Sequence, residues 1–474
     1  MLIIAYSRDE RFLARVPFQF DLDPELVEMD RLLDDRKLVL RVTHDLLLSA
    51  PQAAWNGRPS TPVEVTLRSS VLRHLMGWSY DTTHEEIVGS AKWRWFCRIY
   101  DHSVPNHSTL RDREQLVQPA SLHVLNNRLV GLGREQQVTQ GRKLRTDGTV
   151  IETNIHYPTD SRLLFDSARV LGRLCGEARD LLHPHTPAEK QLFRNRSRRA
   201  QRLARHIAQR LRGTKGQKKT ENQAQTPYRR LVRLVETVLE QVAEIERRLR
   251  RHKSQRALAL ADLLMQYVPL VRQVIAQTTR RVLEHQNVPA PQKIVSLFEP
   301  HTAIIQRGKT APHETEFGHK LWYSEVDGGI ISEYRILKGN PPEPRRWKPS
   351  LKNHQKLFRH PPEVATADRG VFSPENEQAA RDAGIEYVAL PHPGAKSQER
   401  QAYEAQPWFR AALRFRAGIE GRISGLKRAR HLKRCPNRGE TGVERWVGWG
   451  VITNNLVVIA RRLARRHRSK RSQQ

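Results

Sequence analysis

The chain has 474 residues and carries 82 Lys and Arg against 50 Asp and Glu, a formal net charge of +32 at pH 7. This length suits two or three domains, and the 38% of hydrophobic residues are enough for a sizeable core. Because the positive charge is spread along the chain, it favours a nucleic-acid partner over a membrane surface or a merely soluble basic protein.

The cysteines and the apolar runs indicate which classes of protein are disfavoured. The three cysteines are far apart and form no paired motif: Cys97, Cys175 and Cys435. They disfavour a disulfide framework and a structural zinc site, and they fit a reducing cytoplasm. No signal peptide is expected, because charged residues follow the apolar segment 1–6 at once. No membrane span is expected either; the nearest candidate, residues 447–460, predicts a buried helix.

The N-terminal third predicts a series of short helices. Residues 1 to about 55 are expected to be helical, and Gly57-Arg58-Pro59 ends that segment. Apolar periodicity then predicts a helix from about residue 63 that stops at Gly77. Thr82 or Thr83, with a glutamate three residues later, resembles the capping box of a second helix.

A third helix of this module is predicted to begin at Ser108, which is a good N-cap. Its first turns carry Arg111 and Arg113. Short helices joined by tight turns, with arginines early in the last one, suit a helix-turn-helix DNA-binding module. A plain helical bundle whose arginines are solvated is an equally good interpretation of this composition.

The hydrophobic pattern changes twice in the middle of the chain, first to a strand-like pattern and then to a helical one. Residues 143–157 are rich in β-prone residues and predict a strand or hairpin. From residue 165 to about 288 the pattern is helical, with helix starts expected at Thr186-Pro187 and Thr226-Pro227. The polar and basic stretch 213–225 is expected to be a loop between two of these helices.

Strands return from residue 294 to 337, the first of them expected at 294–298, with Asp327-Gly328-Gly329 as a hairpin turn. The proline-rich segment 340–350 is expected to be extended. Short helices and strands then alternate as far as Leu390, and helices follow. This order predicts an α/β core that is interrupted by an all-helical domain.

Three carboxylates stand at chemically suggestive places. Asp147 lies within a predicted strand, where aspartate is unfavourable. Asp368 follows a short predicted strand, at the end where α/β folds place their chemistry. Glu420 lies on a predicted helix. Singly, each is better explained as a turn former or a salt-bridged helix residue. Together they suit phosphodiester cleavage, in which converging carboxylates hold two divalent ions about 4 Å apart.

The motifs around these acids resemble the DDE transposases of bacterial insertion sequences, which have a ribonuclease-H-like core. The first motif is Asp147-Gly148-Thr149 and the second is Thr366-Ala367-Asp368-Arg369-Gly370. The third is an Arg-x3-Glu-x6-Lys pattern formed by Arg416, Glu420 and Lys427, whose offsets place all three on one helix face. Leu413 stands where the family signature often has a tyrosine. The resemblance covers roughly residues 57–160 and 294–460.

The resemblance implies a metal-dependent transposase that cleaves DNA strands and transfers them at the ends of an insertion sequence. Asp147, Asp368 and Glu420 would be the catalytic residues and would bind two Mg²⁺ or Mn²⁺ ions. Arg416 and Lys427 would contact phosphate near the cleaved bond. Further DNA contacts are expected from Arg369, Lys320, Arg111 and Arg113.

The implied fold is an α/β, ribonuclease-H-like mixed sheet with an N-terminal helical DNA-binding module and a large all-helical insertion after the first core strand. The expected domains are a helical segment 1–56, a helix-turn-helix-like domain 57–135, the first part of the catalytic core 140–164, the insertion 165–290, the remainder of the core 291–460 and a basic tail 461–474. The expected partner is double-stranded DNA, both terminal inverted repeats and target, bound by a homodimer in the cytoplasm at the nucleoid, with no membrane involved.

Three other interpretations remain open. One is a non-catalytic DNA-binding protein derived from a transposase. Another is a different ribonuclease-H-like endonuclease, which would cleave DNA without strand transfer. The last is a basic RNA-binding protein, which has no need of carboxylates at strand ends.

Overall fold

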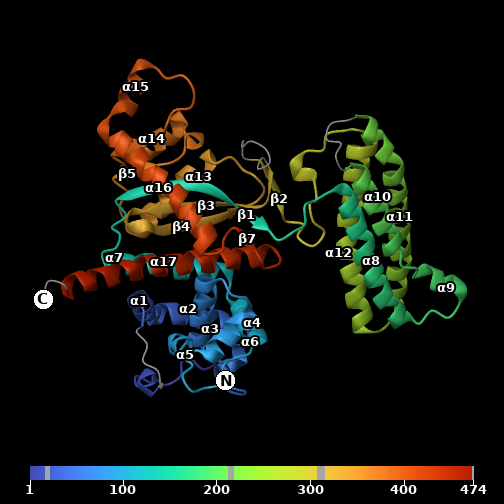
Figure 1. Cartoon of the computed structure of the whole chain (residues 1–474), viewed down its shortest axis with the longest axis horizontal. Coiled ribbons are helices and arrows are strands. Elements are labelled where there is room, and N and C mark those ends of the chain that lie inside the picture. The colour runs from blue at the N-terminus through green and yellow to red at the C-terminus, as the bar shows by residue number, and fades with distance from the viewer. Residues whose placement is uncertain (16–21, 212–217, 307–314, 472–474) are drawn as a thin grey trace. The chain divides into compact units, whose positions relative to one another are not determined.

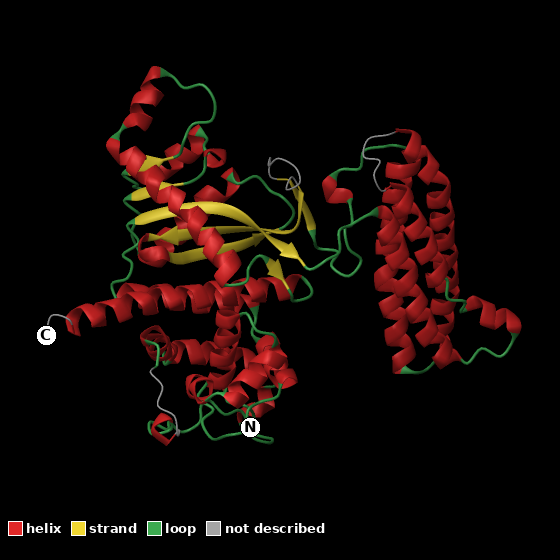
Figure 2. Cartoon of the chain, in the orientation of Figure 1, coloured by secondary structure: helices red, strands yellow, loops and turns green. Residues whose placement is uncertain are grey.

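The computed structural model describes residues 1–15, 22–211, 218–306 and 315–471 (Figure 1). The protein is a mixed α/β structure, mostly helical, with one mixed sheet (Figure 2). It divides into two compact units. Unit 1 consists of Met1–Glu152 and His319–Gln474, and unit 2 consists of Thr153–Gly318.

Unit 1 begins with seven α-helices in its described residues: α1 (Pro24–Leu33), α2 (Arg36–Ser49), α3 (Val63–Met76), α4 (Tyr80–Gly89), α5 (Ala91–Phe96), α6 (His107–Leu116) and α7 (Pro119–Glu135). The stop of α3 at Gly77 is confirmed, and its φ of 72° explains why glycine stands there. The two predicted caps are wrong. Ser79 caps α4 and Asn106 caps α6, because their side chains accept hydrogen bonds from the first-turn amides of Thr82 and Ser108.

The sheet consists of β1 (Lys143–Thr153), β2 (Ala303–Gln306), β3 (Thr315–Val326), β4 (Ile330–Leu337), β5 (Val364–Thr366), β6 (Tyr387–Ala389) and β7 (Arg434–Cys435). Its order is β2-β3-β1-β5-β6, with β4 paired to β3 and β7 to β1. β1, β5 and β6 run parallel, whereas β3 and β4 form an antiparallel hairpin. The predicted turn at Asp327–Gly329 joins that hairpin.

Two predictions between the strands are wrong. Residues 294–298 form no strand. Ile294 and Leu297 pack into the helical core of unit 2, and the Gln277 side chain bonds both the amide and the carbonyl of Ile294, so no strand partner is needed. Residues 344–350 are helical and not extended: Pro344 occupies the first turn of a helix that buries Trp347.

The C-terminal helices of unit 1 are α13 (Pro344–Phe358), α14 (Pro374–Asp382), α15 (Gln398–Ala405), α16 (Pro407–Ala429) and α17 (Glu440–Arg471). The buried helix predicted at 447–460 is confirmed as part of α17, where Trp449, Val451 and Leu456 are fully buried. α17 packs against α1, α3 and α7 on one side and against β4 and α16 on the other. Together with α7, which also packs against β4, this helix joins the N-terminal helices to the sheet.

Unit 2 contains β2, the first residues of β3 and a helical bundle, which is made of α8 (Asp160–Leu182), α9 (Pro187–Leu192), α10 (Ser197–Leu211), α11 (Lys218–Arg251) and α12 (Gln255–Thr278). The predicted start at Thr186-Pro187 is confirmed, with a capping box between Thr186 and Glu189. The predicted start at Thr226-Pro227 is wrong, because Pro227 lies inside α11. Of the predicted loop 213–225, residues 218–225 are helical and 213–217 lie outside the described residues.

One described helix, Gln255–Leu283, is long and apolar enough to cross a membrane by length and composition, which the sequence prediction overlooked. The core helix of a bundle has the same properties. Here Leu264, Val271 and Val274 are buried in the apolar core of unit 2.

Candidate active site

Strand register brings two of the predicted acids to the same level of the sheet. β1 and β5 are parallel neighbours, and Arg145 pairs with Thr366. Asp147 and Asp368 each come two residues later, at the carboxyl end of the pairing. Side chains two residues apart on a strand point to the same face, and neighbouring strands lie about 4.8 Å apart. Two carboxylates from segments far apart in the sequence therefore meet beside one another.

Arg416 lies between these carboxylates. It comes from α16, and its Nη2 atom is 3.9 Å from Oδ2 of Asp147 and 3.6 Å from Oδ1 of Asp368. The Asp147 side chain is 14% exposed and that of Asp368 is 43% exposed. A cationic group at the meeting point of two acids offsets their mutual repulsion. The carboxylates also bond locally: Asp147 accepts from the Gly148 amide at 2.7 Å, and Asp368 accepts from the Arg369 amide at 2.6 Å.

Burial changes the acidity of Asp147. Desolvation raises the pKa of its carboxyl to about 6, and the negative charges of Glu343 and Asp368 act in the same direction. The Gly148 amide and the Arg416 guanidinium lower this pKa but do not outweigh the burial. A buried acid with a raised pKa inside a sheet is typical of a functional site.

A fourth carboxylate, Glu343, stands close to this pair. It precedes α13, and an added Cβ at Gly148 would lie 2.6 Å from its Oε1 atom. Lys320 on β3 forms an ion pair with Glu343 at 3.1 Å and donates a hydrogen bond to the Pro341 carbonyl at 3.0 Å. The Lys320 side chain is only 10% exposed. Its ammonium group therefore faces protein oxygens, and Gly148 leaves the space that Glu343 fills.

Glu420 lies one helical turn after Arg416 on α16 and is exposed. Lys427 follows in the last turn of the same helix and is partly buried. Within the described residues, no group of three or more His, Cys, Asp or Glu side chains is arranged to hold a metal ion. Asp147 and Asp368 present the hard oxygen donors that a divalent cation prefers, around a position where a positive charge already lies. Glu420 does not complete that set in this structure.

A buried ion network fixes the helix that carries Arg416 and Glu420. Glu325 on β3 is fully buried and accepts hydrogen bonds from Arg145 on β1, at 2.8 and 3.2 Å, and from Arg422 on α16, at 3.2 Å. Arg145 also donates to the Phe415 carbonyl and lies over the Phe415 ring, 4.6 Å from its centroid. These three residues, the Arg145–Glu325–Arg422 network, connect two strands to α16.

Gly418 allows the close approach between α16 and Arg145. A Cβ at this position would lie 2.6 Å from Nη1 of Arg145, which is far inside normal contact. Gly421 and Gly425, on the same helix, have open space where a Cβ would be. The glycine requirement on α16 is therefore specific to the face that meets the network.

The other predicted DNA contacts have mixed surroundings. Arg369 is exposed beside Asp368. Arg111 is exposed on α6 and pairs with Asp112 at 2.9 Å. Arg113 is half-buried and donates to the Thr61 carbonyl, so its guanidinium holds the N-terminal helices together.

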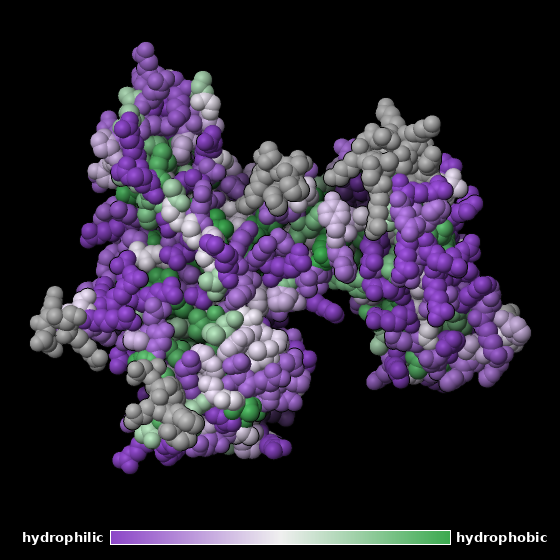
Figure 3. All heavy atoms as spheres, in the orientation of Figure 1, coloured by the Kyte–Doolittle hydropathy of each residue, from purple (hydrophilic) through white to green (hydrophobic). Residues whose placement is uncertain are grey.

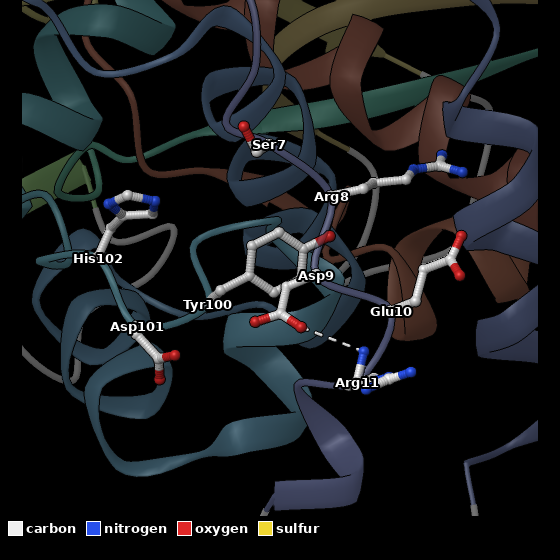
Figure 4. Close-up of a pocket in the computed structure, with 8 residues that line it drawn as sticks. All are labelled: Ser7, Arg8, Asp9, Glu10, Arg11, Tyr100, Asp101 and His102. Carbon is white, nitrogen blue, oxygen red and sulfur yellow. Dashed lines mark hydrogen bonds between the residues drawn. The ribbon is translucent and has the colours of Figure 1, made fainter.

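A hollow in the N-terminal region, drawn in Figure 4, is lined by residues other than these acids. It is lined by Ser7, Arg8, Asp9, Glu10, Arg11, Tyr100, Asp101 and His102. Several of its charges are paired, since Arg8 pairs with Asp34, and Arg15 pairs with both Asp9 and Asp101. We assign it no chemistry.

Sequence reasoning missed Glu343, Glu325 and the role of Arg145. Glu343 lies in a proline-rich stretch predicted to be extended, and no motif marks it. Arg145 stands two residues before Asp147, but its partners lie 180 and 270 residues away. The one sequence signal for Glu325 is its place beside the apolar and aromatic residues of β3, because a glutamate is rarely fully buried without a partner.

Comparison with known proteins adds one finding. The family described as Transposase domain (DUF772) matches residues 15–115. This range includes α1 to α5 and nearly all of α6, and it lies outside the segments that carry Asp147, Asp368 and Glu420. No curated protein and no solved structure matches the chain. The matched domain supports a transposase.

Proposed function

We propose that this chain is a DDE-type transposase that cleaves DNA strands and joins them to a target in a metal-dependent reaction. The observation that carries the proposal is the meeting of Asp147 and Asp368 at the Arg416 guanidinium, on the helix that also carries Glu420. The transposase domain matched at residues 15–115 supports the same function independently of these acids.

The sheet order supports a ribonuclease-H-like core. An antiparallel pair, β4 and β3, precedes β1, and two parallel strands, β5 and β6, follow it across the sheet. Asp147 lies on the central strand β1, and Asp368 follows its parallel neighbour β5. The helices α8 to α12 follow β1 and precede β2 in the chain, which agrees with the proposed all-helical insertion.

The residues of the site suit phosphoryl transfer. Asp147, Asp368 and Glu420 would hold Mg²⁺ or Mn²⁺, and bound divalent ions supply Lewis acidity and charge neutralisation at phosphorus. Arg416 lies within 4 Å of both aspartates, so its guanidinium would be close to a phosphate held there. The Arg145–Glu325–Arg422 network keeps α16 in place, so that Arg416 and Glu420 are presented from a rigid element.

Double-stranded DNA is the partner we propose, with a homodimer holding two element ends, in the cytoplasm and at the nucleoid. The net charge of +32 supports a polyanionic partner. Two ends must be held together for strand transfer, and a dimer provides two equivalent sites.

A non-catalytic DNA-binding protein is the second candidate. The observation that favours it is the exposed position of Glu420, which does not join Asp147 and Asp368 in a three-acid group. This candidate keeps DNA binding and lacks cleavage.

A cleavage assay on a duplex that carries the inverted repeats flanking the gene distinguishes the transposase from the non-catalytic DNA-binding protein. We expect nicking and strand-transfer products from the wild-type protein in Mg²⁺, and none from Asp147→Ala, Asp368→Ala or Glu420→Ala. Glu399→Ala, an exposed acid on α15, is the matched control and should cleave normally. Wild-type binding without cleavage supports the second candidate, and cleavage without joining supports an endonuclease.

A further inference from the structure

Helix α10 differs in charge from the rest of the bundle in unit 2. Its 15 residues include no acidic side chain. Five arginines lie on it: Arg198, Arg199, Arg202, Arg205 and Arg210. Ala200 and Ile207 are fully buried and anchor the opposite face against α8 and α11. The helix is therefore strongly amphipathic, with guanidinium groups in place of the usual mixed polar surface.

Three of these arginines form one line along the helix. Arg198, Arg202 and Arg205 are spaced by four and three residues, which places them on one face. All three are exposed. At 1.5 Å per residue, their backbone positions span about 10 Å. We call these three residues the α10 basic face; hydrophilic side chains cover the side of α10 and α11 that Figure 3 displays.

Some arginines of the neighbouring helices are neutralised by acids on the same helix. On α8, Asp166 pairs with Arg162 at 3.3 Å and with Arg169 at 3.0 Å. On α11, Glu244 pairs with Arg247 at 2.8 Å and with Arg248 at 2.9 Å. Within the described residues, Arg198, Arg202 and Arg205 form no ion pair and no hydrogen bond. Like charges at these spacings repel and weaken an isolated helix, and a bound anion would offset that repulsion.

We propose that the α10 basic face binds the phosphate backbone of double-stranded DNA. The proposal rests on the function proposed above and assigns part of its DNA contact to unit 2. Guanidinium groups match phosphate oxygens in a bidentate arrangement, and three of them in a line follow a polyanion without reading bases. The contact is therefore independent of sequence, and its strength depends on salt.

Salt-dependent binding tests this proposal with the full-length protein and a duplex of unrelated sequence in EDTA, between about 50 and 200 mM salt. The test variant carries Arg198→Gln, Arg202→Gln and Arg205→Gln. Each phosphate contact contributes about −0.9 to the slope of log K against log salt, so the loss of three should flatten the slope by about 3. Affinity at the low-salt end should fall at least tenfold.

The matched control changes three paired arginines of α8, by Arg162→Gln, Arg169→Gln and Arg179→Gln. It lowers the net charge equally, and its slope should change by less than about 1. A third variant replaces the α10 residues by lysine, keeps the charge and should retain the slope. Circular dichroism compares the helix content of all variants. If the triple glutamine variant does not fold, Arg202→Gln alone tests the contact, with an expected flattening of the slope by about 1.

The outcomes separate this proposal from the proposed function. Equal slopes for the α10 glutamine variant and the α8 control overturn the α10 contact, whether or not the wild type cleaves DNA. A flattened slope together with absent wild-type cleavage supports the contact and contradicts the enzyme. Loss of binding to duplex RNA but not to duplex DNA in the α10 variant also overturns the proposal, in favour of an RNA partner.

Discussion

The Arg145 guanidinium donates two hydrogen bonds to the Glu325 carboxylate, at 2.8 and 3.2 Å, in the interior of unit 1. Arg422 adds a third at 3.2 Å. Glu325→Ala leaves two arginines without their counter-charge, so we expect the free energy of unfolding to fall by about 3–5 kcal/mol. Urea unfolding measures this change. Glu399→Ala should unfold like the wild type, and an equal stability of both variants would contradict the role of the network.

Gly418 and Gly425 on α16 offer a paired test of the helix position. Gly418→Ala places a Cβ 2.6 Å from Arg145, so α16 or the network must shift, and we expect DNA cleavage to fall at least tenfold, since misplacing active-site groups by about 1 Å has effects of this size. Gly425→Ala meets open space and should raise helix stability by up to about 1 kcal/mol with unchanged cleavage. Cleavage rates and thermal unfolding are measured for both variants. Equal cleavage by the two would exclude the proposed role of Gly418 in positioning α16.

Asp147 should lower the stability of the fold at neutral pH. Its pKa of about 6 lies above the ordinary 3.8, so the folded state binds this proton more tightly than the unfolded state. Its contribution is fully present below about pH 4 and is lost as pH rises through about 6, at a cost on the order of 2–3 kcal/mol.

Asp147→Asn removes this titration. We expect the variant to unfold at a higher temperature than the wild type at about pH 7, with a smaller difference at about pH 4, and to have no cleavage activity. Thermal unfolding at both pH values measures the effect. If the difference in unfolding temperature between Asp147→Asn and the wild type does not grow with pH, the ionised Asp147 carboxylate does not destabilise the fold.

Arg416 and a divalent cation would compete for the carboxylates of Asp147 and Asp368. Arg416→Gln removes a positive charge within 4 Å of Asp147 and Asp368, so we expect Mn²⁺ to bind about fivefold more tightly, from about 1 kcal/mol of electrostatic competition. DNA cleavage should nevertheless decrease, because a phosphate held at the two aspartates would lose the guanidinium of Arg416. Calorimetric Mn²⁺ titration and cleavage assays test both halves. Arg414→Gln, an exposed arginine on the same helix, should change neither.

Local patterns in the sequence predicted the order of most strands and helices, because period and capping residues are local properties. The stop of α3 at Gly77 and the capping box at Thr186 are examples. The predicted caps of α4 and α6 were wrong because a neighbouring polar residue supplies the bond to the same turn. The predicted strand at 294–298 failed because a side chain, Gln277, satisfies its backbone.

The candidate site was predictable to a smaller extent. Asp147 and Asp368 were visible as acids in and after strands, and their meeting follows from the register of β1 and β5. The catalytic roles of these residues and of Glu420 stay predictions. Glu343 and Glu325 could not be found in advance, because their importance comes from contacts with Lys320, Arg145 and Arg422 that only the folded chain creates.

Helix α17 lies against α1, α3 and α7 and also against β4 and α16, so the matched transposase domain and the two aspartates belong to a single compact unit. A DNA sequence bound by the N-terminal helices would then lie at a constant distance from Asp147 and Asp368. The number of base pairs between the recognised sequence and the broken bond would then be constant, because α17 and α7 each pack against N-terminal helices and against β4.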